Sequence, residues 1–100
     1  MIVTLCGSTR FKEEFERVNR ELTLAGDIAL APGVFGHAGD SITEDEKIRL
    51  DNLHKKKIDM ANAIYVINKG GYIGESTKSE IAYAKAKGKM IIMLEDDLNG

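Results

Sequence analysis

Short apolar runs alternate with longer helical segments along this chain, and this alternation constrains its fold more than any other feature. The runs cover residues 2–6, 28–31, 63–67 and 90–94 and are typical of buried strands. Helical patterns fill residues 10–25, 41–60 and 76–87 between them. Strands that alternate with helices form parallel sheets with right-handed crossovers. The sequence therefore predicts an α/β fold with a four-stranded parallel sheet, or a five-stranded one if residues 95–100 begin a further unit.

The helical segments have recognisable faces and boundaries. Spacings of four, three and four residues give the first helix one apolar face, made of Phe11, Phe15, Val18 and Leu22. Gly26 is expected to end that helix. Either Ser41 or Thr43 can cap the second helix, and Ser76 is expected to cap the third. The glycine-rich stretches 32–40 and 68–75 are expected to form loops.

Length and composition exclude several classes of protein. The 100 residues, 43% hydrophobic and 30% charged, fit one domain spanning residues 1–100. A net charge of −2 gives no electrostatic case for binding nucleic acid or an anionic membrane, and no stretch approaches a membrane span. Cys6 is the single cysteine, so it is expected to be a buried core thiol without a disulfide partner. A cytoplasmic protein is expected.

The turn after the first predicted strand is a candidate anion site. In parallel sheets, ligands bind beyond the carboxyl ends of the strands. Gly7 permits close approach of the backbone, Ser8 and Thr9 offer hydroxyls, and Arg10 offers a two-pronged donor for phosphate or carboxylate. The alternative is an ordinary helix cap followed by a surface arginine.

Glu80 occupies an unexpected place on the third predicted helix. Thr77, Glu80, Ile81 and Ala84 follow the spacing i, i+3, i+4 and i+7, which defines the apolar face of that helix. A charged group is costly to bury unless it is paired or used, so Glu80 is a candidate catalytic carboxylate. The alternatives are a glutamate that stabilises the helix dipole and one that pairs with a neighbouring lysine.

Further candidates come from the second glycine-rich loop and the second helix. Tyr72 can stack on a flat ring, and Glu75 or Ser76 can hydrogen-bond to a sugar, although such a loop can equally be a plain turn. Asp59 sits at the negative end of its helix, which suggests a fixed partner such as Arg10 or a substrate, or else full solvation. His37 and His54 have no supporting pattern, and no cluster has metal-ligand spacing, so no metal is expected.

Three stretches together resemble the nucleoside 2-deoxyribosyltransferase superfamily, including its 2′-deoxynucleoside 5′-monophosphate N-glycosidase branch. They are Gly-Ser-Thr-Arg-Phe at 7–11, Lys-Ile-Asp-Met-Ala-Asn at 57–62, and Gly-Glu-Ser-Thr-Lys-Ser-Glu-Ile-Ala-Tyr-Ala at 74–84, the most specific of the three. The resemblance implies a flavodoxin-like, Rossmann-like three-layer sandwich that cleaves the N-glycosidic bond of a nucleoside or nucleotide by hydrolysis or 2-deoxyribosyl transfer.

The resemblance also implies roles for single residues. Glu80 matches the nucleophile, and Asp59 is the candidate second carboxylate. The substrate-binding residues would be Gly7, Ser8, Thr9, Arg10, Tyr72, Gly74, Glu75, Ser76 and Thr77. Gly74 stands where the family usually has an acidic partner, six residues before the nucleophile. No cofactor is expected, and a homodimer or higher homo-oligomer is. The alternative function is a non-catalytic nucleotide-binding module.

Overall fold

Four parallel strands and three α-helices make up the fold, which the computed structural model describes for residues 1–35 and 41–95. The elements in chain order are β1 (Ile2–Gly7), α1 (Lys12–Leu24), β2 (Ile28–Leu30), α2 (Glu44–Met60), β3 (Ala63–Ile67), the 3-10 turn η2 (Lys69–Gly71), α3 (Glu75–Ala86) and β4 (Met90–Met93). All neighbouring strands pair in parallel, in the order β2-β1-β3-β4. This flavodoxin-like topology confirms the predicted fold class, with four strands in the described part of the chain.

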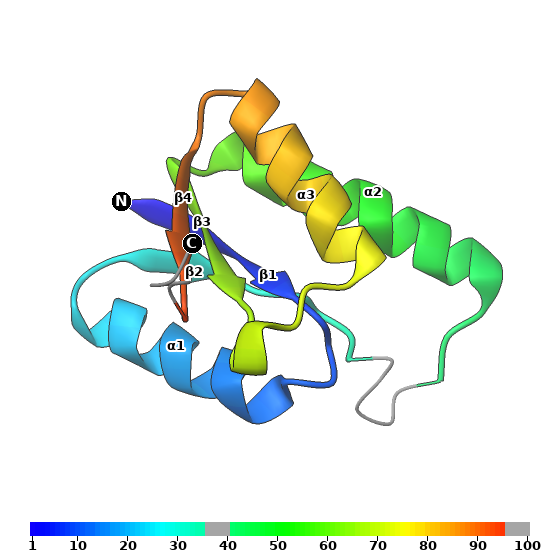
Figure 1. Cartoon of the computed structure of the whole chain (residues 1–100), viewed down its shortest axis with the longest axis horizontal. Helices are drawn as coiled ribbons and strands as arrows, with labels where there is room; N and C mark the ends of the chain where they lie inside the picture. The colour runs from blue at the N-terminus through cyan, green and yellow to red at the C-terminus, as the bar shows by residue number, and fades with distance from the viewer. Residues whose placement is uncertain (36–40, 96–100) are drawn as a thin grey trace.

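The sheet is the middle of three layers (Figure 1), with α1 on one face and α2 and α3 on the other. Side chains of β1 alternate between these faces. Val3 and Leu5 pack with Phe15 of α1 in one apolar cluster, while Cys6 packs with Ile58 of α2 in a second. The sheet thus has a separate core on each side.

The helix boundaries partly differ from those predicted. Thr43 caps α2 through a capping box, in which its hydroxyl accepts from the Glu46 N–H and the Glu46 carboxylate accepts from the Thr43 N–H. The prediction that Ser76 caps α3 is wrong, because the helix begins at Glu75. Gly74 is its N-cap, in extended conformation and without a side-chain hydrogen bond, so Ser76 already lies within the first turn.

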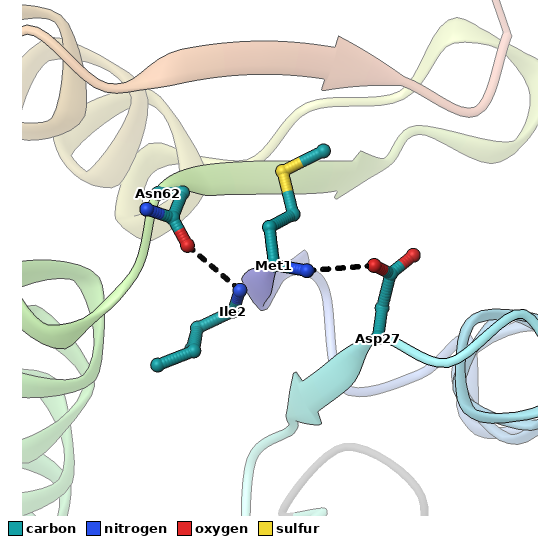
Figure 2. Close-up of polar contacts among 4 residues, drawn as sticks. All are labelled: Met1, Ile2, Asp27 and Asn62. Atoms are coloured by element: carbon teal, nitrogen blue, oxygen red, sulfur yellow. Dashed lines mark hydrogen bonds and ion pairs between the residues drawn. The ribbon is translucent and has the colours of Figure 1, made fainter.

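The amino ends of the strands are joined by polar contacts (Figure 2). The ammonium group of Met1 lies 2.9 Å from Oδ1 of Asp27, just before β2, and the Ile2 N–H donates to Oδ1 of Asn62, just before β3, at 2.8 Å. These contacts fix the start of β1 relative to both of its neighbours. They lie at the opposite end of the sheet from residues 7–10.

Candidate active site

A cavity of about 640 Å³ opens at the carboxyl ends of the strands. Its walls come from the turn after β1, residues 32–34 after β2, the inner side of α2, and the start of α3. This is where ligands bind in parallel α/β sheets, and the volume falls within the range of small-molecule sites, about 300–1,000 Å³. The cavity is therefore the candidate active site.

The lining joins segments that are far apart in the sequence. It includes every residue predicted to bind substrate, together with the predicted nucleophile: Gly7, Ser8, Thr9, Arg10, Tyr72, Gly74, Glu75, Ser76, Thr77 and Glu80. In the sequence these residues lie on separate turns and helices. The parallel topology brings them together at the carboxyl edge of the sheet. His37 was also a candidate, but it lies outside the described residues.

Gly7 allows the first turn to approach β3 closely. Its φ is +154°, a conformation that other residues rarely adopt. A Cβ atom at this position would lie only 2.7 Å from the backbone oxygen of Ile67. Glycine is therefore needed for β1 to reach this register with β3 and for the chain then to turn into the cavity wall.

Arg10 is held in place at the cavity rim. Its Nε donates to Oγ of Ser8 at 3.0 Å, and its Nη2 donates to the hydroxyl of Tyr72 at 3.4 Å. The guanidinium also lies 4.5 Å from the centre of the Tyr72 ring, in cation–π contact. A guanidinium has five N–H donors, so these bonds orient the group and leave further donors for an anion.

Glu80 lies in the second turn of α3 and is 9% exposed. Thr77 and Ala84 are buried on the same face, as the helical spacing predicts. The pKa of Glu80 is raised from 4.5 to about 7, mainly by burial and also by repulsion from Asp51 on α2. The Cys6 thiol, which hydrogen-bonds to the carboxyl, and Lys55 act in the opposite direction on this pKa. The carboxyl is thus poised to change its charge near neutral pH.

Cys6 and His54 surround Glu80, and sequence reasoning did not place them there. Sγ of Cys6 lies 3.6 Å from Nε2 of His54, and both residues are buried. The pKa of His54 is lowered from 6.5 to about 4, mainly by burial and also by the positive charge of Lys57. Burial also raises the pKa of the Cys6 thiol, with Glu80 adding to the effect. The predicted core burial of Cys6 is correct, but its neighbours are polar.

The spacing of α2 explains the positions of these neighbours once Ile58 is known to lie in the core. Asp51, His54 and Ile58 follow i, i+3 and i+7, so they share one face of the helix. Ile58 belongs to the buried core, whereas Asp51 and His54 line the cavity. His54 is therefore buried because it lies on the same face of α2 as Ile58, which packs in the core.

The structure does not bring Asp59 to the cavity, which corrects the sequence prediction. Helix α2 runs against the direction of the strands, so its last turn lies near the amino end of the sheet, where Asn62 donates its backbone N–H to the Ile2 oxygen at 2.8 Å. Asp59 accepts a hydrogen bond from the Tyr83 hydroxyl at 2.7 Å, and its predicted partner Arg10 belongs to the opposite end. The carboxylate that α2 contributes to the cavity is Asp51.

Comparisons with known proteins do not identify a family for this chain. No protein-family model matches the sequence, and a search of curated proteins finds no significant relative. In the part of the chain that the structure describes, no helix combines the length and the apolar character needed to cross a membrane.

Proposed function

We propose that this protein cleaves the N-glycosidic bond of a 2′-deoxynucleoside or its 5′-monophosphate, with Glu80 as the nucleophile. The observation that carries the proposal is a nearly buried carboxyl group in the wall of a ligand-sized cavity, facing the same space as a preorganised arginine. The resemblance of residues 7–11 and 74–84 to the nucleoside 2-deoxyribosyltransferase superfamily supports the same assignment.

In the proposed reaction, a carboxylate oxygen of Glu80 attacks the anomeric carbon of the sugar. A C–O bond forms, the C–N bond to the base breaks, and the electron pair leaves with the base, which takes up a proton. Positive charge develops on the sugar in such a transition state, and a carboxylate stabilises it. Water then hydrolyses the glycosyl ester, or a second base accepts the sugar. With a pKa of about 7, a substantial fraction of Glu80 is ionised at neutral pH.

Arg10 favours a phosphorylated substrate. Its side chain lies beside the hydroxyl of Ser8 and against Tyr72, so its fork of donors is oriented before any ligand arrives. A phosphate takes two parallel N–H bonds from such a fork. We therefore assign the 5′-phosphate to the turn of residues 7–10 and the sugar to the region around Glu80.

The first test incubates the protein with a panel of deoxynucleosides and their monophosphates, with and without a second free base. Released base is followed by chromatography. Base release is expected with at least one substrate, and base exchange would identify a transferase. Glu80→Gln is expected to lower the rate by at least about 10³-fold, because it removes the nucleophile while keeping the size of the side chain.

The exposed Glu75, also in the cavity wall, provides a matched comparison. Glu75→Gln should retain far more activity than Glu80→Gln. Base release that survives in Glu80→Gln would contradict the assignment of the nucleophile. Binding of a nucleotide without release of base from any substrate would favour the alternative of a non-catalytic nucleotide-binding module. The expected homo-oligomer stays a prediction, which light scattering can measure in the same preparation.

A further inference from the structure

Three potential metal ligands from three different elements meet on the inner side of the cavity. They are the thiol of Cys6 on β1, the ring of His54 on α2 and the carboxyl of Glu80 on α3. Their ligand atoms all lie within 4.8 Å of one another, and the three residues are 0%, 8% and 9% exposed. From this geometry we propose that Cys6, His54 and Glu80 together bind a Zn²⁺ ion.

The spacing of the sulfur and nitrogen atoms fits such an ion. Zn–S bonds of about 2.3 Å and Zn–N bonds of about 2.0–2.1 Å, at a tetrahedral angle, put the two atoms about 3.6 Å apart. Sγ of Cys6 and Nε2 of His54 are separated by 3.6 Å. The carboxylate of Glu80 can close the remaining distance because its side chain has three rotatable bonds.

The donor set selects the class of metal. One sulfur, one imidazole nitrogen and one carboxylate oxygen suit Zn²⁺, whereas Mg²⁺ and Ca²⁺ require mainly oxygen ligands. A thiolate and a carboxylate together neutralise the two positive charges of the ion, so that the buried site carries no net charge. The thiol proton, and any proton on the carboxyl, pass to the solvent when the metal binds.

The surroundings support and give access to the site. His54 is carried by helix α2 and is only 8% exposed, so packing restricts the position of its ring. His54 and Glu80 both line the 640 Å³ cavity, which offers the ion a route to the ligands. Three protein ligands would leave a fourth tetrahedral position for an exchangeable water.

The metal site shares Glu80 with the proposed function, but the two proposals are tested separately, because metal binding is measured without substrate. Untagged protein is stripped with a chelator, and Zn²⁺ is titrated in competition with a chromogenic chelator. One ion per chain is expected. Co²⁺ is then added as a spectroscopic probe. A thiolate-to-cobalt charge-transfer band can come only from Cys6, because the sequence has no other cysteine.

Variants assign the ligands. Cys6→Ser is expected to abolish the charge-transfer band, and both Cys6→Ser and His54→Gln should weaken Zn²⁺ binding by at least about tenfold. His37→Gln is the matched control, since it removes the only other histidine of the sequence, and it should change neither result. Circular dichroism checks that each variant is folded.

Two outcomes would overturn the proposal. Absence of the Co²⁺–thiolate band in the unmodified protein would show that Cys6 does not bind the metal, and this measurement needs no variant to fold. Zn²⁺ affinity unchanged in both Cys6→Ser and His54→Gln would show that the ion binds elsewhere. In either case the three residues are a hydrogen-bonded cluster alone. Neither outcome bears on base release, which is measured separately.

Discussion

The two faces of the sheet are filled with different chemistry, although β1 supplies side chains to both. Between the sheet and α1, the buried core consists of apolar side chains: Val3, Leu5, Phe15, Val18 and Ile67. On the other face, which α2 and α3 cover, there is also an apolar cluster around Ile58. Next to it lie the buried side chains of Cys6, His54 and Glu80, which carry ionisable groups. Adjacent residues of one strand, Leu5 and Cys6, thus belong to two different cores, one apolar and one that also contains ionisable groups.

This difference separates the sources of stability and reactivity. Burying apolar area stabilises a fold, whereas burying ionisable groups opposes folding and shifts their pKa values. The α2 and α3 face carries this cost: the pKa of Glu80 is raised to about 7 and that of His54 is lowered to about 4. Perturbed titrating groups in a cleft are typical of functional sites. The α1 face carries no such cost in its buried cluster, which consists of apolar side chains.

The largest expected effect comes from the apolar face. Phe15 is 1% exposed and its ring lies edge-on to Phe35, with ring centres 5.5 Å apart. Phe15→Ala removes this buried ring and leaves a cavity, so we expect a loss of about 3–5 kcal/mol in the free energy of unfolding. Urea unfolding measures it. If the two faces are independent, the Zn²⁺ affinity of folded Phe15→Ala should equal that of the unmodified protein. A lower Zn²⁺ affinity in this variant would show that the two faces are coupled.

The second prediction concerns the charge of Glu80. The pKa is raised on folding from 4.5 to about 7, so the folded state binds this proton more tightly than the unfolded state does. The contribution of Glu80 to stability is therefore largest below pH 4.5, and it is lost as the pH rises to 7 and above. Glu80→Gln does not titrate, so its stability relative to the unmodified protein should increase by about 3 kcal/mol between pH 4.5 and pH 8.

Urea unfolding of both proteins at a series of pH values checks this second prediction. The difference in unfolding free energy between the two proteins reports on Glu80, because His54 is present in both. The charged and titrating neighbours of Glu80 are Asp51, His54 and Lys55 on α2 and Cys6 on β1. A difference that is constant with pH would mean that the carboxyl is solvated rather than buried, and the contrast between the faces would then disappear.

The third prediction tests the rim of the polar face. The proposed function assigns Arg10 to the substrate phosphate, so Arg10→Met should lower kcat/KM for a deoxynucleoside monophosphate by about 10–100-fold, the value of a charged hydrogen-bonding pair. The value for the matching deoxynucleoside should change little. The ratio of the two constants is the measurement. An equal loss on both substrates would instead assign Arg10 to positioning Tyr72, which it contacts.

Most of the fold could be predicted from the sequence because all its strands are apolar runs and the two central ones, β1 and β3, are buried on both faces. The run 63–67 is apolar without interruption, and the structure gives β3 the same bounds. Helix starts were less certain. Both Gly74 and Ser76 are chemically able to begin α3, and only the backbone conformation shows that Gly74 does.

The candidate site could be predicted only in part. Gly7 ends β1, Arg10 precedes α1 and Glu80 lies in the second turn of α3, so the order of the elements places them near one edge of the sheet. The positions of His54 and Asp51 depend on which side of α2 faces the sheet. The apolar residues of α2 do not form one stripe, and both Ile48 and Leu53 are exposed in the structure. The sequence therefore does not show which side of α2 faces the sheet. The structure was needed to find the cluster of polar residues that this side brings together.

The smallest effect is expected where polar groups are present but not buried, at the amino end of the sheet (Figure 2). Asp27 pairs with the Met1 ammonium group at 2.9 Å, and the two side chains are 25% and 42% exposed. Solvent-exposed ion pairs contribute about 0–1 kcal/mol, so Asp27→Asn should lower the free energy of unfolding by no more than about 1 kcal/mol, and by less in high salt. Urea unfolding at two salt concentrations measures this. A loss as large as that of Phe15→Ala would contradict the comparison, because it would make polar pairing at this end as important for stability as the apolar core.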